Sequence, residues 1–247
     1  MPPDPVLLPA GDPGSPTTPV AVAVPGLGLT AAAYRGVVDA LDGRVPMAVV
    51  ALPAFGLPAG PGVALDPESC ADELAHRLAD QAFLACGPLV LVGHSASCQV
   101  VAEVARRHPQ VVRGLVLVGP TADPRMAPRR HLVARWLRTA VREDPRRVPG
   151  MLRAYATTRL SGFAPALRAA RRRDLRSTLA ASMVPVLLGR GPHDHLSPSD
   201  WLDALARTRP GIDVRTASEG AHNVPVTHPA HVARWVAAVV DATVVDV

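Results

Sequence analysis

Six short runs of mostly aliphatic residues constrain the fold of this chain more than any other feature of its sequence. Continuous apolar runs of this length are typical of parallel strands that are buried on both faces. Between them lie stretches with helical spacing, such as residues 67–85 and 231–240. This alternation predicts an α/β fold, a doubly wound and mostly parallel sheet with helices on both sides. The predicted strands are VAVAV (20–24), MAVVAL (47–52), LVLVG (89–93), GLVLVG (114–119), VPVLLG (184–189) and IDVRT (212–216).

The alternation is interrupted once. After the strand that ends at Gly119, about sixty residues pass before the next strand begins at Val184, and a simple crossover needs far fewer. This interval has helical patterns but no strand pattern. We therefore expect residues 121–182 to form an inserted helical lid over the carboxyl edge of the sheet, where open α/β sheets bind ligands. Residues 20–120 and 183–247 would form the core.

Length and composition exclude several other classes of protein. A chain of 247 residues, 48% of them hydrophobic, can bury a substantial core. No apolar run is long enough to cross a bilayer, so stable membrane insertion is not expected. Residues 1–19 contain seven prolines and no basic segment, which predicts a disordered leader rather than a secretory signal. Three cysteines (Cys70, Cys86 and Cys98) without metal-ligand spacing indicate neither a disulfide framework nor a metal site, and the expected compartment is the cytoplasm.

The segment Gly93-His94-Ser95-Ala96-Ser97 lies where a predicted strand meets a predicted helix. A nucleophile elbow has this form, because its serine occupies a strained turn that needs small residues two positions before and after it. Gly93 and Ser97 meet that requirement. The alternative is an ordinary strand-to-helix turn with Ser95 as the helix N-cap, but the strand and the helix around the motif favour the elbow.

A serine hydroxyl becomes a good nucleophile only when a base accepts its proton and an acid orients that base. Asp194 follows the predicted strand 184–189, and His222 lies in a loop of small residues after the last predicted strand. The order Ser95, Asp194, His222 is the order expected for a triad on a sheet of this kind. Asp123 is the alternative acid, although its position in TADP favours a turn residue.

With these motifs, the chain from about residue 20 to 241 resembles the α/β-hydrolase fold superfamily of serine hydrolases with a helical lid. The segments that carry the resemblance are VPVLLGRGPHDHLSP, EGAHNVPVTHPAHVARWV, VAVAVPGLGLTAAAY and VVALPAFGLP. The resemblance implies Ser95 as nucleophile, His222 as base and Asp194 as acid, with no cofactor and no metal. It also implies that the backbone N–H groups of Leu27 and Ala96 form the oxyanion hole.

Two positions depart from the family pattern, and several others are expected near the substrate. Pro25 replaces the usual histidine before the oxyanion glycine, and Ser97 replaces the commoner glycine. Gly26, Gly28 and His94 are expected beside the substrate pocket, although a side chain at His94 more often packs than reacts. Aromatic and aliphatic residues of the insertion would line an apolar acyl pocket or only anchor the lid: Trp136, Leu137, Met151, Leu152, Tyr155, Phe163 and Leu167.

The remaining residues of interest have simpler interpretations. His193 and His195 are expected to face solvent or the lid, and His228 and His231 to be surface or capping residues near the last helix. Cys98 is expected to be a buried apolar residue rather than a second nucleophile.

Charge is distributed unevenly along the chain. All 26 basic residues are arginine, as in proteins from GC-rich bacterial genomes, and 15 of them fall within residues 121–182 beside only four acidic residues. This asymmetry predicts attraction to an anionic partner, such as a carrier protein, a CoA thioester, an acidic substrate or a lipid headgroup. The alternative is a solvated outer face. Nucleic acid is not expected, because aromatic residues are scarce and no binding motif is present.

The function that these features predict is a serine hydrolase. It would cleave a small-molecule ester, thioester or lactone with an apolar acyl group, through an acyl-enzyme intermediate. Two alternatives use the same fold: a lyase, cyclase or C–C bond hydrolase of bacterial secondary metabolism, and a non-catalytic ligand receptor.

Overall fold

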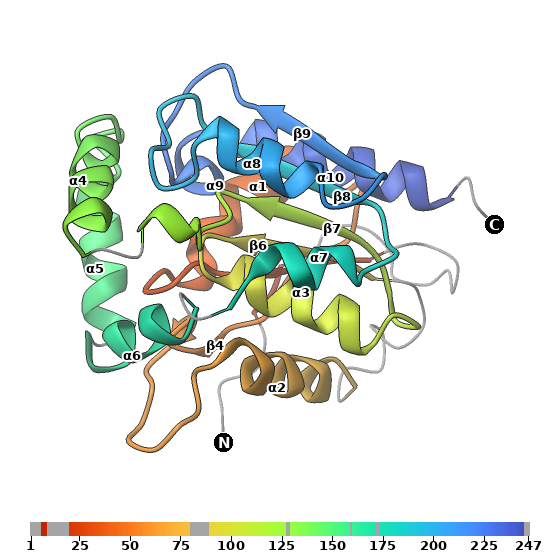
Figure 1. The fold of residues 1–247 in the computed structure, drawn as a ribbon, viewed down its shortest axis with the longest axis horizontal. Helices are drawn as coiled ribbons and strands as arrows, with labels where there is room; N and C mark the ends of the chain where they lie inside the picture. The colour runs from red at the N-terminus through yellow and green to blue at the C-terminus, as the bar shows by residue number, and fades with distance from the viewer. Residues whose placement is uncertain are drawn as a thin grey trace.

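The computed structural model describes residues 6–8, 20–79, 89–126, 129–158, 160–170 and 173–244. Its centre is a seven-stranded sheet in the order β1-β3-β2-β6-β7-β8-β9, in which β1 alone runs antiparallel to its neighbour (Figure 1). The mostly parallel sheet predicted from the apolar runs is therefore confirmed. The strands are β1 (Val6–Leu8), β2 (Val20–Val24), β3 (Met47–Val49), β6 (Leu89–His94), β7 (Val112–Val118), β8 (Val186–Arg190) and β9 (Ile212–Thr216).

Two predictions need correction, one about a strand and one about the leader. The run at 47–52 does not form one strand, because β3 ends at Val49 and the chain turns into a small separate pair, β4 (Leu52–Pro53) and β5 (Gly56–Leu57). The leader predicted to be disordered contains β1, which pairs with β3 in the register Val6↔Val49. A short apolar segment adds here to an open sheet edge, whose backbone groups otherwise lack partners. The other residues of that leader lie outside the described residues.

Side chains of the central strands alternate between two hydrophobic clusters, one on each face of the sheet. Ala21, Ala23, Val90, Val92, Val116 and Val118 pack in the cluster of α1 (Arg35–Leu41) and α10 (Pro229–Val244). Their sequence neighbours, such as Val22, Leu91 and Leu117, pack in the cluster of α2 (Pro67–Ala79), α3 (Ser97–Arg107), α7 (Leu175–Ala180) and α8 (Ser199–Ala206). Both faces are thus dry, which is why these strands consist of continuous apolar runs.

The described elements between β7 and β8 are all helices, joined by short turns and loops. They are η3 (Pro124–Met126), α4 (Arg129–Ala140), α5 (Val148–Thr158), α6 (Leu160–Ala170) and α7. Figure 1 shows α4, α5 and α6 standing beyond the carboxyl ends of the parallel strands, whereas α7 packs beside α3 in the core layer. We refer below to residues 121–170 as the insertion.

The remaining elements are short and lie near the carboxyl edge of the sheet. η1 (Ala31–Tyr34) precedes α1, and α9 (Val224–Thr227) precedes α10. None of the helices in the described ranges has both the length and the apolar composition needed to cross a bilayer.

Candidate active site

Ser95 occupies the sharp turn between β6 and α3. Its φ of 59° lies in the left-handed region, which is costly for a residue with a side chain. Two backbone hydrogen bonds hold this conformation: the Ser95 N–H donates to the Val118 carbonyl at 2.9 Å, and the Ser95 carbonyl accepts from the Cys98 N–H at 3.2 Å. The sequence-predicted elbow therefore has the strained backbone that presents a serine side chain to a ligand.

The two small residues around Ser95 have different reasons to be small. A Cβ at Gly93 would lie 2.7 Å from the Cα of Cys98, so no side chain fits there. Ser97 is buried, and its hydroxyl accepts from the His94 N–H at 2.9 Å and lies 2.9 Å from the carbonyl oxygens of both Val24 and His94. Serine at this position therefore ties the end of β2 to the elbow, which glycine could not do.

His222 and Asp194 meet beside the elbow although they are 28 residues apart. The Nδ1 of His222 lies 2.8 Å from Oδ2 of Asp194, whose other oxygen accepts from the N–H groups of Leu196 and Ser197 at 2.9 and 3.0 Å. Gly119, with a φ of +57°, leaves room for this pair, because a Cβ there would lie 3.0 Å from both bonded atoms. This geometry orients the imidazole with its Nδ1 toward the carboxylate.

The electrostatics of the pair favour its charged form. Burial alone would raise the pKa of Asp194, but the charge and hydrogen bond of His222, the Ser197 N–H and Arg190 outweigh it and hold the pKa below its ordinary value. Burial alone would lower the pKa of His222, but Asp194 and then Glu143 outweigh it and raise that pKa above its ordinary value. His222 is therefore a stronger base than a free imidazole.

The backbone of His222 is held from two sides. Its carbonyl accepts from Nε2 of His94 at 3.0 Å, and its N–H donates to Oε1 of Glu143 at 2.9 Å. Burial, then the neighbouring charge of His222, lower the pKa of His94 to about 3, so His94 stays neutral with its proton on Nε2. His94 was predicted to lie at the substrate pocket, but it is buried behind the cavity and supports the histidine loop instead.

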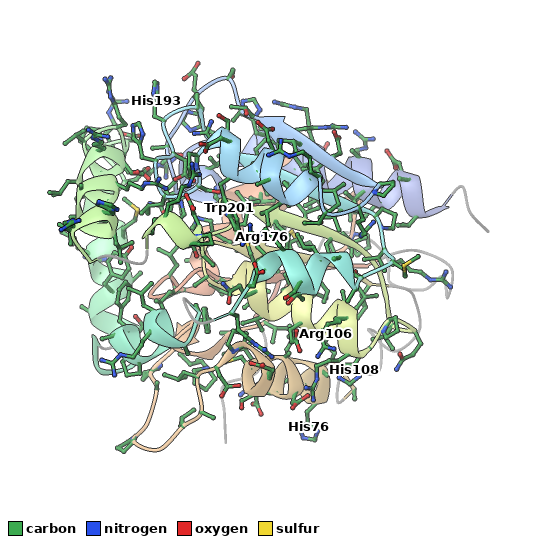
Figure 2. All side chains as sticks on the ribbon, in the orientation of Figure 1. His76, Arg106, His108, Arg176, His193 and Trp201 are labelled. Atoms are coloured by element: carbon green, nitrogen blue, oxygen red, sulfur yellow. The ribbon has the colours of Figure 1, made fainter. Side chains whose placement is uncertain are left out.

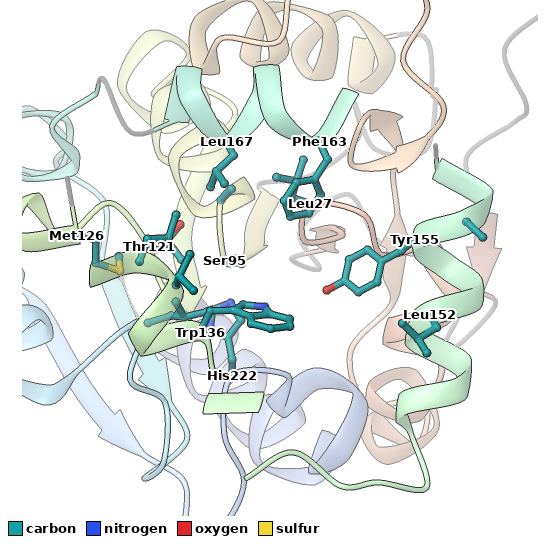
Figure 3. A pocket seen from close by; sticks show the side chains of 15 residues that line it. Leu27, Ser95, Thr121, Met126, Trp136, Leu152, Tyr155, Phe163, Leu167 and His222 are labelled. Carbon is teal, nitrogen blue, oxygen red and sulfur yellow. The ribbon is translucent and has the colours of Figure 1, made fainter. Parts of the chain in front are cut away.

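A cavity of about 590 Å³ opens between the elbow and the insertion (Figure 3). Ser95 and His222 line its inner end, and Tyr155 and Leu152 of α5 lie across it. The other lining residues are Leu27, Ala96, Thr121, Met126, Leu132, Val133, Trp136, Ala156, Phe163, Leu167 and Leu196. Among the described residues that line the cavity, none has a charged side chain, apart from His222 when it is protonated.

Two predicted pocket residues of the insertion do not line this cavity. Leu137 points to solvent with 52% of its surface exposed, and Met151 is buried on the other side of α5. Sequence reasoning missed Thr121, Met126, Leu132, Val133, Ala156 and Leu196. Helical spacing shows that α4 and α5 have apolar faces, but it does not show which side of each face turns inward.

The loop after β2 passes directly beneath the insertion. Gly26 and Gly28 were predicted to lie at the pocket, but neither lines it: Gly26 packs against the ring of His94, and Gly28 packs beneath the ring of Tyr155. Leu27 between them does line the cavity. The loop is held by hydrogen bonds from the Gly28 N–H to the Ala54 carbonyl and from the Leu29 N–H to the Gly26 carbonyl, both 3.0 Å long.

The expected oxyanion donors are unengaged. Within the described residues, the N–H groups of Leu27 and Ala96 have no hydrogen-bond acceptor in the protein. Both residues line the cavity next to Ser95. Two such donors are what an oxyanion at this end of the cavity requires.

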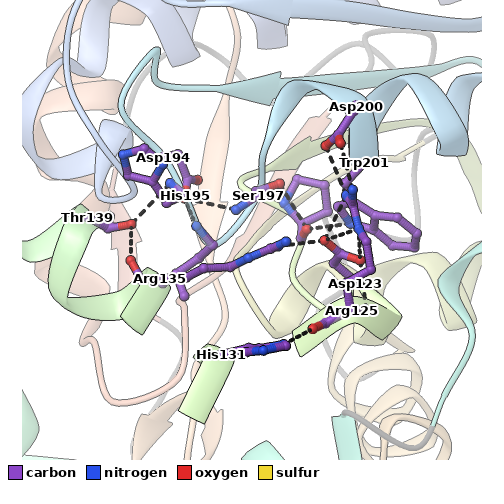
Figure 4. A network of polar contacts seen from close by, with 12 residues as sticks. Asp123, Arg125, His131, Arg135, Thr139, Asp194, His195, Ser197, Asp200 and Trp201 are labelled. Carbon is purple, nitrogen blue, oxygen red and sulfur yellow. Dashed lines mark hydrogen bonds and ion pairs between the residues drawn. The ribbon is translucent and has the colours of Figure 1, made fainter. Parts of the chain in front are cut away.

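Asp123 is not bonded to His222 and lies in a turn, as expected, where its carboxylate accepts from the Arg125 N–H at 3.0 Å. Its buried carboxylate accepts from Nε of Arg125 at 2.9 Å and from Nη1 of Arg135 at 2.6 Å, and Arg125 also pairs with Asp200 on α8 at 2.6 Å (Figure 4). Asp123 is therefore a turn residue that also carries an ion-pair network. This ion-pair network fastens η3 and α4 to a core helix.

The other predicted histidines do not line the cavity. His193 and His195 are exposed, and His193 extends from the surface in Figure 2. His231 is hydrogen-bonded to Ser218, and His228 to Thr227. Cys98 is fully buried, as expected. Across the described ranges, no three histidine, cysteine or acidic side chains converge in a way that could hold a metal ion.

Known proteins resemble this chain in sequence profile and in fold. The profile of the Alpha/beta hydrolase family matches residues 21–239, and no curated protein matches in sequence. The structure of an E-2-(acetamidomethylene)succinate hydrolase aligns with a TM-score of 0.75 and 21% identity, over 94% of this chain and 93% of that one. An enol-lactonase from Burkholderia xenovorans LB400 aligns with 0.73 and 19%, over 94% of each chain. A thermophilic esterase from Thermogutta terrifontis, solved with malate bound, aligns with 0.71 and 23%, over 95% and 92%. At these identities the likeness concerns the fold.

Proposed function

Because the chain belongs to the alpha/beta hydrolase family and is an enzyme of hydrolase type, we propose that it is a serine hydrolase whose triad is Ser95, His222 and Asp194. The observation that carries this proposal is the Asp194–His222 hydrogen bond of 2.8 Å at the end of a cavity that Ser95 also lines. A strained serine and an oriented imidazole in one cavity are the parts that nucleophilic acyl transfer needs.

The proposed reaction proceeds in two halves. His222 accepts the hydroxyl proton through Nε2 while Ser95 Oγ attacks the carbonyl carbon, and Asp194 stabilises the imidazolium that forms. The N–H groups of Leu27 and Ala96 donate to the oxyanion. When the tetrahedral intermediate collapses, the imidazolium protonates the leaving group. Water, activated by the same imidazole, then releases the acyl group from Ser95.

The lining of the cavity supports an uncharged, apolar acyl group. Among the described lining residues, the side chains are apolar except for Ser95, Thr121, Tyr155 and His222, and none of these is an arginine that could pair with a substrate carboxylate. The volume of about 590 Å³ suits a small molecule. We therefore propose an ester, thioester or lactone as the substrate class, with a neutral acyl part.

The arginines of the insertion support a second part of the proposal, an anionic leaving group. Arg125 and Arg135 are paired with Asp123, but Arg130 and Arg138 are exposed on α4, and Arg142 is exposed in the turn that follows it. Val133 and Trp136 of the same helix line the cavity and are about half exposed. A CoA or carrier-protein thioester would thus place its acyl chain in the cavity and its negative charges beside α4.

The direct test combines labelling with a matched pair of substrates. A fluorophosphonate probe should modify Ser95, identified by mass spectrometry of the peptide, and should not modify Ser95→Ala. That variant should lose about 10⁴ to 10⁶ in turnover while keeping its circular dichroism spectrum. A p-nitrophenyl hexanoate should be hydrolysed well, and the half ester of hexanedioic acid, which has a carboxylate at the chain end, poorly. Wild-type turnover by Ser95→Ala would refute the proposed nucleophile.

A further inference from the structure

The insertion is attached to the two loops that bear the acid and the base. We propose that Glu143 and Thr139 are positioning residues, which hold the histidine loop and the acid loop from the insertion and so align His222 and Asp194. This inference rests on the proposed function, since it concerns the same triad. Neither residue touches the cavity in which the reaction would occur.

Glu143 contacts the histidine loop through one carboxylate oxygen. Oε1 accepts from the N–H of His222 at 2.9 Å, and from the N–H and the side-chain amide of Asn223 at 3.0 Å each. Oε2 is buried and has no hydrogen-bond partner in the part of the chain that the structure describes. A carboxylate gives up hydration at this position, and the three hydrogen bonds to the histidine loop are what compensate it.

Thr139 makes the corresponding contact with the acid loop. Its hydroxyl donates to the Arg135 carbonyl one turn earlier in α4, at 2.9 Å, and accepts from the His195 N–H at 3.1 Å (Figure 4). Because the hydroxyl proton is used within α4, the oxygen lone pairs are directed at His195, the residue that follows Asp194. Thr139 is 2% exposed, so water does not compete for this hydrogen bond.

The core holds the same two loops from the opposite side. His94 donates to the His222 carbonyl at 3.0 Å, and the Arg190 guanidinium donates to the Asp194 carbonyl at 2.8 Å. Each loop is therefore fixed between one core side chain and one side chain of the insertion. If α4 and the turn that follows it left their position, the N–H groups of His222 and His195 would lose their acceptors, and the core contacts alone would orient the pair.

Glu143 has a second effect, through its charge. After the larger contribution of Asp194, it raises the pKa of His222. Glutamine at this position keeps a carbonyl oxygen as acceptor but removes the charge, and alanine removes both. The two substitutions therefore separate positioning from electrostatics.

The first experiment needs no substrate. The pKa of the His222 ring is measured by NMR with ¹⁵N-labelled histidine, in a Ser95→Ala background. Glu143→Gln should shift the titration of His222 to lower pH. Glu73→Gln is the matched control, since Glu73 pairs with Arg77 on the surface of α2 and its loss should leave the titration unchanged. An unshifted His222 in Glu143→Gln would overturn the electrostatic part.

The second experiment measures turnover. Glu143→Ala should lower kcat by about tenfold to a hundredfold with KM nearly unchanged, because small misplacements of catalytic groups are costly. Glu143→Gln should recover most of that loss at high pH, with the acid limb of kcat/KM moved to lower pH. Thr139→Val, which is isosteric, should lower kcat by a smaller factor, and Thr139→Ser should restore it.

The outcomes distinguish this inference from the proposed function. Full turnover by Ser95→Ala would overturn the triad, and the NMR titration would still report on the contacts of Glu143. If instead the wild type is active and Glu143→Ala and Thr139→Val, folded by circular dichroism, keep its kcat and pH profile, the positioning role is overturned and the triad stands.

Discussion

The core and the insertion contribute to the active site in opposite ways. The core side presents Asp194 and His222 almost fully buried, each fixed by several hydrogen bonds at the ends of parallel strands. The insertion presents Trp136 and Val133, each 53% exposed, on a helix beside the cavity. Buried polar groups need hydrogen-bond partners, so few orientations are open to them. Half-exposed apolar side chains, in contrast, tolerate substitution. In the proposed function, the core would therefore carry the reaction and the insertion would select the substrate, with Glu143 and Thr139 as the exceptions.

The largest expected effect distinguishes two buried aspartates, Asp194 of the core and Asp123 of the insertion. Asp194→Asn should lower turnover by about 10⁴, because the amide favours the wrong tautomer of His222. Asp123→Asn should leave kcat within about tenfold and instead lower stability by about 1–3 kcal/mol, since it weakens the contacts of Arg125 and Arg135. Steady-state kinetics and thermal melts of both variants provide the measurement. The reverse ranking would move the acid to the end of β7.

The pH dependence tests chiefly the core, because Asp194 contributes more to the raised pKa of His222 than Glu143 does. The reaction needs neutral His222, whose pKa is raised above its ordinary value, chiefly by Asp194 against the effect of burial. As pH falls through that raised pKa, kcat/KM should decline about tenfold per pH unit. The midpoint should lie above the value of about 6.5 for an unperturbed imidazole. A pH profile from 5 to 9 with a neutral ester locates it, and a midpoint below the unperturbed value would contradict the proposed charge pairing.

Two truncations, one in the core and one in the insertion, distinguish an effect on stability from an effect on specificity. Leu117→Ala removes a fully buried core side chain and should cost about 2–5 kcal/mol in the free energy of unfolding, with little change in chain-length preference. Trp136→Ala should cost less than about 1 kcal/mol but change kcat/KM for long acyl esters by about tenfold. Denaturant unfolding and a series of p-nitrophenyl esters measure the two effects. A Trp136→Ala variant with an unchanged ester profile would remove α4 from the acyl site.

The smallest expected effect concerns the charge of the insertion. If α4 attracts an anionic leaving group, kcat/KM for an acyl-CoA should fall severalfold as salt rises, because surface charges are screened over roughly 8 Å at physiological ionic strength. The value of kcat should barely change. Arg138→Gln with Arg142→Gln should flatten this dependence, and a neutral ester should show none. Kinetics independent of salt would leave the arginines as a solvated helix face.

The sequence by itself determined the parallel sheet and pointed to the residues of the proposed triad. Strands buried on both faces require apolar side chains at consecutive positions, so the parallel strands were visible as continuous runs. The elbow was visible because a serine with positive φ needs small neighbours. Asp194 and His222 could be placed because each follows a strand, and carboxyl ends of parallel strands meet at one edge.

Only the tertiary structure decided what surrounds those residues. Glu143 and His222 are 79 positions apart, and Thr139 and His195 are 56 apart; a single acceptor for a distant backbone N–H leaves no periodic pattern in the chain. The same holds for His94, which was predicted at the pocket but contacts the histidine loop. It also holds for β1, which pairs with the open edge of β3. The local sequence pattern indicates burial and backbone strain, because each of these features shows in the residues of a single segment. Contacts between distant segments depend on how the strands, loops and insertion pack together, and that is a property of the packed molecule.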